Sequence, residues 1–270
     1  MTGRGTNSYL VGAADVVVVD PGPDDDAHLD ALVTRAGGEI RYVLVTHAHP
    51  DHSAGARRLA ARTGAALLGP PASGGFSPDA VLSDGDVVAV PGWRLEVLET
   101  PGHCADHLCF VLEEAAPGGV DAPGGGSGTG RRRHRVLLSG DHVLGGTSTV
   151  VAAPGGDMAA YVASLERLLA LAPPLDEIAP GHGEMLGDAR AVLEAYVARR
   201  RAREAEVVAA LELAPGATPA EIAAAVYPTI APGLEQAALA QTWAHLRKLY
   251  DDGRASSPDP ASPHAPWTAP

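Results

Sequence analysis

The chain has 270 residues, of which 46% are hydrophobic and 4% aromatic, and its formal net charge is −13. This length accommodates one large domain, or one domain with a small appendage. So acidic a chain repels polyanions, and binding of nucleic acid would require a local basic patch. Two cysteines, Cys104 and Cys109, are too few for a dense disulfide framework. Because no segment is apolar enough to be a leader or a membrane span, we expect a cytoplasmic protein with no membrane partner. The sequence does not specify its oligomeric state.

Short apolar strands and helices follow one another through the first part of the chain. We expect strands at 8–11 and 15–20, a helix at 26–36, and a buried strand at 42–46. Ser53 is expected to cap a helix that ends at Gly64. Further strands are expected at 65–68, 86–90, 94–98, 108–112, 135–139 and 177–179, with a hairpin joining 86–90 to 94–98 and a helix at 157–172.

A segment between two of these strands has an unusual composition. Residues 117–130 are mostly glycine with small and polar side chains, which predicts a flexible insert over about 115–134. It ends in Arg131-Arg132-Arg133-His134-Arg135, the densest basic run in the chain. This run is a solvated solubility element, which we favour, or a phosphate contact.

The end of the chain has helical signals followed by a tail. A long helix is expected at 189–211, and Thr218-Pro219-Ala220-Glu221 is typical of a helix start. Two helices are expected near 219–226 and 234–251, whereas the Pro-, Ser- and Ala-rich residues from 255 onward predict disorder. The expected division is a first domain at 1–190, the long helix and a helical module at 191–254, and a disordered tail at 255–270.

Potential metal ligands are concentrated where strands end. His47-Ala48-His49-Pro50-Asp51-His52 has four of them in six residues, directly after the 42–46 strand. Imidazole and carboxylate groups suit zinc, and a turn after a rigid strand can direct several ligands to one point. His103, Asp141 and His182 each follow another strand at a glycine-bearing turn. The repetition of this arrangement predicts a metal centre.

The set His47, His49, Asp51, His52, His103, Asp141 and His182, with Asp20 at the end of the second strand, resembles the metallo-β-lactamase superfamily of hydrolases. The resemblance covers roughly the first 190 residues. It implies an α/β fold, an αββα sandwich, with a binuclear metal site at one edge of the two sheets. It also implies that His47, His49 and His103 hold one metal and that Asp51, His52 and His182 hold the other. Asp141 would bridge the two metals, and Asp20 would orient a ligand histidine.

Two Zn²⁺ ions per chain are the expected cofactors, although these nitrogen and oxygen ligands also suit iron or manganese. Such a pair lowers the pKa of a shared water and yields a metal-bound hydroxide at neutral pH. The resemblance makes Asp51 a catalytic residue as well as a ligand, because it helps to orient this nucleophile.

Position 141 distinguishes branches of the superfamily. Asp141 stands where β-lactamases of classes B1 and B2 have cysteine, as in the glyoxalase-II-like branch, and this argues against antibiotic hydrolysis as the native role. Cys104 is adjacent to His103, but neighbouring side chains on a turn usually point in different directions. We therefore expect Cys104 to be a thiol that binds no metal.

The loop at 144–149 and the terminal helices resemble the lactamase-β-like-2 group, in which a winged-helix-like module follows the catalytic domain. That group contains endoribonucleases specific for single-stranded RNA and thioesterases that release acyl chains from carrier proteins. The implied substrate is therefore an acyl thioester or ester, with an acyl carrier protein as a possible partner, or single-stranded RNA. Acidic charge favours the acyl substrate, whereas arginines at 199–203 and 131–135 keep RNA open. Thr147, Ser148 and Thr149 are candidate substrate contacts because they closely follow Asp141. The terminal helices could equally be a lid that packs on the core.

Three functions remain open at this point. The leading one is a binuclear zinc-dependent hydrolase. The others are an iron-dependent redox enzyme of the same fold and a nucleic-acid-binding scaffold without turnover. The complete ligand set favours hydrolysis.

Overall fold

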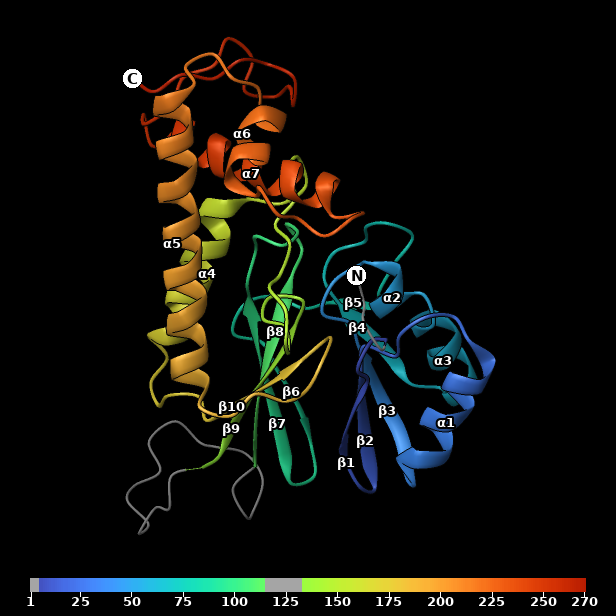
Figure 1. The fold of residues 1–270 in the computed structure, drawn as a ribbon. Coiled ribbons are helices and arrows are strands. Elements are labelled where there is room, and N and C mark those ends of the chain that lie inside the picture. The colour runs from blue at the N-terminus through green and yellow to red at the C-terminus, as the bar shows by residue number, and fades with distance from the viewer. Residues whose placement is uncertain (1–4, 115–132) are drawn as a thin grey trace. The chain divides into compact units, whose positions relative to one another are not determined.

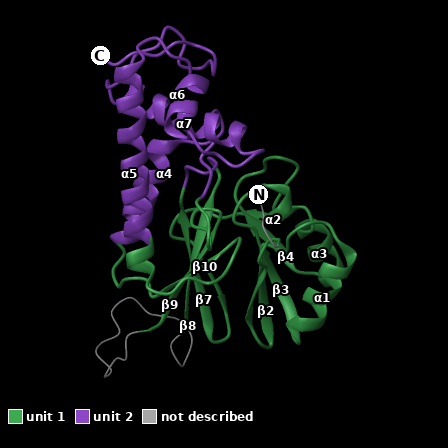
Figure 2. Ribbon diagram, in the orientation of Figure 1, with its two compact units in different colours: residues 1–100, 106–148, 171–192 green, residues 101–105, 149–170, 193–270 purple. Residues whose placement is uncertain are grey.

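The computed structural model describes residues 5–114 and 133–270, so most of the predicted flexible insert lies outside the described residues (Figure 1). The chain forms two compact units (Figure 2). The first contains residues 1–100, 106–148 and 171–192, and the second contains residues 101–105, 149–170 and 193–270. The prediction assigned the helix near 157–172 to the first domain, whereas the structure groups it with the terminal helices.

The first unit contains two five-stranded sheets. One has the order β1 (Tyr9–Gly12), β2 (Asp15–Val19), β3 (Glu39–Leu44), β4 (Ala66–Gly69) and β5 (Ala80–Val81). Its strands are parallel except for the antiparallel pair β1 and β2. The connecting helices are α1 (Asp26–Ala36), α2 (Pro50–Ser53) and α3 (Ala56–Thr63). The predicted bounds of α1 are confirmed, whereas β5 was not anticipated.

The second sheet has the order β10 (Glu177–Pro180), β9 (Arg135–Gly140), β8 (Leu108–Glu114), β7 (Trp93–Glu99) and β6 (Val87–Val90). The antiparallel pairing of β6 and β7 confirms the predicted hairpin. The antiparallel register of β7 and β8 sets Leu98 opposite Cys109, and the parallel register of β9 and β10 sets Leu138 opposite Ala179.

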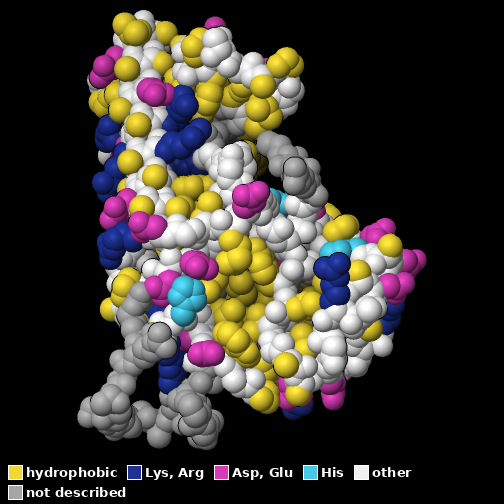
Figure 3. Space-filling model, turned by 60° about the horizontal axis from the view of Figure 1, so that its bottom comes forward, with side chains coloured by type: hydrophobic (Ala, Val, Ile, Leu, Met, Phe, Trp, Pro, Cys, Tyr) yellow, Lys and Arg dark blue, Asp and Glu magenta, His cyan; other side chains and the backbone are white. Residues whose placement is uncertain are grey.

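The valines of β2 explain how the layers of this unit are held together. Successive side chains of a strand point to opposite faces of its sheet. Val16 and Val18 pack with α1 and α3 in one buried cluster, and Val17 and Val19 pack against the second sheet in another. β2 is therefore apolar on both faces, and its sheet lies between the helices and the second sheet of this unit. In Figure 3, hydrophobic side chains reach the surface in the centre of the view.

The second unit is mostly helical. It contains α4 (Met158–Leu169), nearly all of α5 (Ala189–Leu213), α6 (Pro219–Val226) and α7 (Glu235–Asp251). The capping box predicted at the start of α6 is present, because the Thr218 hydroxyl accepts from Glu221 N and the Glu221 carboxylate accepts from Thr218 N. Within the described residues, none of the helices has the length and apolar character needed to cross a membrane.

The tail that was expected to be disordered is ordered in the structure. Isolated β-bridges pair Ser256 with Thr268 and Ala217 with Trp267. The Trp267 side chain is fully buried, with its ring edge-on to Tyr250 at 6.2 Å. Composition predicted disorder because proline, serine and alanine bury little apolar surface. One tryptophan supplies the apolar area that those residues lack.

Two further local expectations are corrected. Ser53 does not cap a helix, because its hydroxyl donates to the carbonyl oxygens of Ala48 and His49, and α3 begins only after Gly55. Arg135, the last residue of the basic run, is buried, and its guanidinium donates to Glu113 Oε1 at 2.6 Å. Arg135 therefore joins β8 to β9 and cannot contact phosphate, while Arg131 and Arg132 lie outside the described residues.

The burial of His245 predicts that acid destabilises the second unit. Burial, reinforced by the nearby charges of Arg200, Arg203 and Lys248, lowers the pKa of His245 to about 3. In the unfolded chain this pKa is about 6.5. As pH falls from 6.5 towards 3, the unfolded state binds a proton that the folded state does not, so stability decreases by at most about 1.4 kcal/mol per pH unit from this residue. We expect the free energy of unfolding, measured with urea at several values between pH 7.5 and 4.5, to decrease less steeply with falling pH for His245→Asn than for the parent chain.

The control for this measurement is His264→Asn, since His264 is exposed near the end of the same unit. That variant should retain the parent slope. An unchanged slope in His245→Asn would show that the acid sensitivity lies elsewhere.

Candidate metal centre

The predicted ligand loop joins β3 to α2. Val45, Thr46 and His47 are buried after β3, and His49 is the residue that precedes Pro50 at the start of α2. Proline is favoured in a first helical turn because its fixed φ suits the helix and its missing N–H is not needed there. The short helix turns the chain sharply, so that Asp51 and His52 follow His47 and His49 into one region.

Asp20 anchors this loop from the end of β2. Its carboxylate accepts hydrogen bonds from Thr46 N at 2.8 Å and from Thr46 Oγ1 at 2.7 Å, and lies 2.8 Å from His52 Nδ1. Asp20 is buried and has a φ of 49°, in the left-handed region that few residues other than glycine adopt. Its contact with His52 leaves the Nε2 atom of that ring to face the other ligands.

The same contacts fix the orientation of His47. The Thr46 hydroxyl donates its hydrogen to Asp20, so its oxygen accepts from His47 Nδ1, which lies 3.0 Å away. When this ring is neutral, donation through Nδ1 leaves the lone pair on Nε2, because a neutral imidazole has one donor and one acceptor nitrogen. This is the atom needed to bind a metal.

Four side chains converge from α2 and from the turns that follow β9 and β10. His182 Nε2 lies 3.2 Å from Asp51 Oδ2, and Asp141 Oδ1 lies 3.3 Å from the Nε2 atoms of both His52 and His182. Gly181 permits this approach, because a Cβ there would lie 2.7 Å from His52 Cε1 and 2.9 Å from Asp141 Oδ1. The glycine-bearing turn predicted at His182 thus makes room for neighbouring ligands.

Charge within this cluster favours cations. Burial opposes protonation of His52 and His182, but the neighbouring carboxylates outweigh it and raise the pKa of each ring to about 10. Burial likewise favours a neutral Asp141, yet the contacts with His182 and His52 hold the pKa of its carboxyl well below the usual range. Anionic carboxylates grouped in a largely buried site require positive charge, which either imidazole protons or metal ions can supply.

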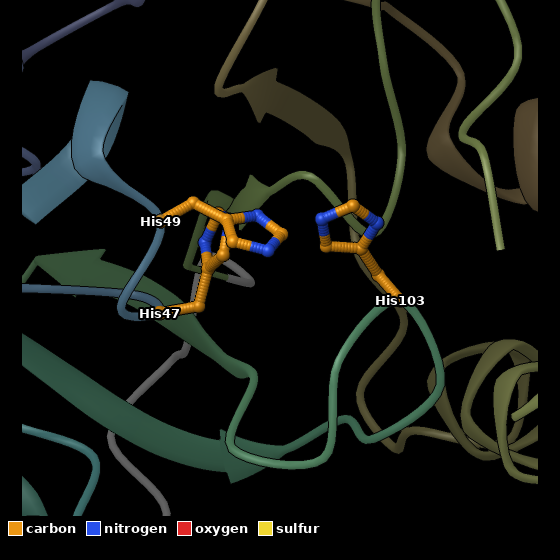
Figure 4. Close-up of side chains that lie close together, drawn as sticks. All are labelled: His47, His49 and His103. Atoms are coloured by element: carbon orange, nitrogen blue, oxygen red, sulfur yellow. The ribbon is translucent and has the colours of Figure 1, made fainter. Parts of the chain in front are cut away.

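The described residues contain three compact groups of potential ligands, each with atoms within 4.8 Å of one another. Asp51, His52 and His182 form one group, and His47, His52 and Asp141 form another. The third consists of His47, His49 and His103 (Figure 4). Imidazole nitrogens and carboxylate oxygens at these separations fit divalent metal cations. All seven predicted ligands occur in these groups, and Cys104 occurs in none of them.

Sequence reasoning missed His107. Its buried ring accepts a hydrogen bond at Nε2 from Asp141 N at 3.1 Å, while Nδ1 lies 3.0 Å from Thr100 Oγ1. Because the Thr100 hydroxyl donates to Cys109 Sγ, its oxygen accepts from His107 Nδ1. His107 therefore holds the backbone at Asp141. The available signal was a histidine at the start of a strand, four residues after His103, but its partner could not be inferred from that position.

The three candidate substrate contacts differ in their surroundings. Thr147 is exposed and Ser148 is half-buried. Thr149 is only 1% exposed, and its carbonyl oxygen accepts from Arg200 Nη2 at 2.6 Å. Thr149 is therefore the least accessible of the three, and all three stay predictions as substrate contacts.

Comparisons with known proteins indicate the family to which the domains of this chain belong. The model of the Metallo-beta-lactamase superfamily matches residues 1–116, and that of the Beta-lactamase associated winged helix domain matches residues 218–261. The chain is 28% identical over 266 residues to the Beta-lactamase-like protein 2 homolog of Caenorhabditis elegans, covering 94% of this chain and 82% of that protein. It is 29% identical over 217 residues to an atrochrysone carboxyl ACP thioesterase of Aspergillus fumigatus, covering 77% of this chain and 60% of that protein.

The chain spans less than two thirds of the length of several curated relatives that it matches, including this thioesterase. The crystal structure of a beta-lactamase domain protein from Burkholderia ambifaria has the same fold, with a TM-score of 0.76 and 23% identity, covering 98% of this chain and 87% of that one. The predicted fold class and family resemblance are confirmed. The chain carries a metallo-β-lactamase superfamily domain followed by a β-lactamase-associated winged helix domain.

Proposed function

We propose that this protein is a binuclear zinc-dependent hydrolase that cleaves an acyl thioester or ester. The observation that supports this proposal is the convergence of seven ligand side chains in three overlapping groups. His47 and His52 each belong to two groups, as expected where two cations share one site. His47, His49 and His103 would hold the first cation, and Asp51, His52 and His182 the second, with Asp141 between them.

The side chains have distinct tasks in this proposal. Two Zn²⁺ ions, when bound, would lower the pKa of a shared water towards 7 and polarise the substrate carbonyl. Asp51 is the more accessible carboxylate, with 35% of its side chain exposed against 13% for Asp141. Asp51 can therefore orient the attacking water by accepting its hydrogen bond, while Asp20 and Thr46 keep the imidazoles in their ligand orientation.

The surroundings of the arginines favour an acyl substrate over single-stranded RNA. Arg135 and Arg200 are buried, and Arg201 and Arg203 form ion pairs with Glu166 and Glu206. Figure 3 likewise shows acidic side chains beside the basic ones on the displayed face. The relative named as a carrier-protein thioesterase supports the same choice, and an acyl chain on a carrier protein is the substrate class that we propose.

Replacing Asp141 should distinguish a working metal centre from an idle scaffold. We expect Asp141→Ala to lower kcat/KM for a small acyl thioester by about 100-fold or more, because the carboxylate common to both cations is lost. The control is Asp30→Ala, which removes an exposed carboxylate paired with Arg62. Thiol release and metal content should be measured on both folded variants. Unchanged turnover in Asp141→Ala would refute the hydrolase proposal.

Metal removal tests the cofactor and the substrate class together. Chelation should abolish thioester hydrolysis, and two equivalents of Zn²⁺ should restore it. The restored protein should be compared on acyl thioesters, on thioesters attached to a carrier protein and on single-stranded RNA. Faster cleavage of RNA would select the endoribonuclease alternative. Restoration by iron alone, with oxygen consumption, would select the redox alternative.

The number of protons released when a metal binds provides an independent test of metal binding. Because the pKa values of His52 and His182 are about 10 in the metal-free cluster, both rings carry a proton at pH 8, and a cation must displace it. We expect Zn²⁺ affinity to rise with pH up to about 10. Calorimetry at pH 8 in buffers of different ionisation enthalpy should show one released proton fewer for His52→Gln. An equal count would contradict this assignment.

A further inference from the structure

The second unit contains a buried arginine that donates to two neutral groups. Arg200 of α5 is 2% exposed. Its guanidinium donates to Thr149 O at 2.6 Å and to Gln241 Oε1 at 3.1 Å, and its central carbon lies 5.0 Å from the centre of the Tyr161 ring. Removing a guanidinium from water is costly, so a position that keeps one inside must rely on well-placed partners. These partners hold the Arg200 guanidinium in a defined position, so that it can orient the segments that contact it.

The terminal helices hold the arginine in place. Gln241 of α7, which accepts from Arg200, donates through Nε2 to the hydroxyl of Tyr227 at 2.8 Å. The Tyr227 ring in turn packs against the guanidinium of Arg203 at 4.1 Å. Gln241 and Tyr227 both lie in the segment that matches the winged helix domain. That segment therefore has a structural task within its own unit.

The backbone carbonyl of Thr149, which Arg200 holds, is next in the chain to Val150, whose carbonyl contacts the proposed metal ligand His103. Val150 directly follows Thr149, and its carbonyl oxygen lies 2.9 Å from His103 Nδ1. This contact occupies Nδ1, so Nε2 is the nitrogen that the proposed function requires as the ligand atom of His103. In metal sites, the hydrogen bond at one ring nitrogen sets the direction of the other.

The turn that carries His103 is also fixed on α4. Ser164 Oγ donates to Pro101 O at 2.9 Å, and Asp157 N donates to Gly102 O at 2.8 Å. A Cβ at Gly102 would lie 2.3 Å from Tyr161 Cα, so the turn lies directly against the residue whose ring Arg200 covers. Arg200 thus supports His103 by two routes, through the Thr149–Val150 backbone and through Tyr161.

We infer that Arg200 is a positioning residue for the metal ligand His103, and that Gln241 of the winged helix segment serves the same task by holding Arg200. The inference rests on the proposed function, since it requires His103 to bind a cation. It predicts that loss of Arg200 weakens one cation site selectively, without removing any ligand.

The test is Zn²⁺ binding to the full chain in competition with a chromogenic chelator. We expect Arg200→Leu to lose about 10- to 100-fold in affinity for one of the two ions and to retain the other. Arg200→Lys, which keeps the charge but lacks the planar group whose two separate nitrogens donate to Gln241 and Thr149, should lose less. Arg201→Leu is the control, because Arg201 is adjacent to Arg200 in the chain and its side chain is exposed. Among the ion pairs of the described residues, it pairs only with Glu166. His103→Ala gives the reference for complete loss of that ion.

Each result decides a different point. Folded Arg200→Leu with parental affinity for both ions, beside a His103→Ala protein that lost one, would overturn the inference and leave the proposed function intact. A parent chain that binds no Zn²⁺ would overturn the proposed function itself. If Arg200→Leu does not fold, Arg200→Lys and Gln241→Met are compared, and parental affinity in both would equally overturn the inference. Circular dichroism and melting temperature report folding for every variant.

Discussion

The candidate centre depends on the carboxylate of Asp20. This group joins the end of β2 to the first residues after β3 through both the backbone and the hydroxyl of Thr46. It also contacts His52 on α2, so a single buried side chain fixes the two ends of the ligand loop. The positive φ at Asp20 is the conformational cost of directing its carboxylate there, and such strain persists only where surrounding contacts determine it.

Electrostatics then explains why these side chains remain together in a largely buried site. Carboxylates and imidazoles at separations near 3.3 Å stabilise one another only when protons or cations balance the negative charge. The contacts at the far ends of the rings leave Nε2 of both His47 and His52 directed inward. The ligand atoms are thus preorganised, which lowers the cost of capturing a cation. His107 adds to this by holding the backbone of Asp141.

The second unit contains His103, one of the proposed metal ligands. Its arginines were candidates for an RNA-binding patch, yet Arg200 is buried against Thr149, Gln241 and Tyr161. The turn carrying His103 belongs to this unit, where α4 and the backbone at Val150 hold it. In the role that we infer, the helical module orients the turn that carries His103, and this role requires no nucleic acid partner.

The sequence by itself determined the features that depend on neighbours along the chain. The ligand run from His47 to His52, the bounds of α1 and the capping box at Thr218 follow from local spacing and backbone hydrogen bonding. Only the tertiary structure decided which distant groups meet. Arg135 pairs with Glu113 because β8 and β9 are neighbours, and Trp267 is buried among segments far from it in the sequence. Periodicity reports which residues face a core, but it carries no information about the partner on the other side.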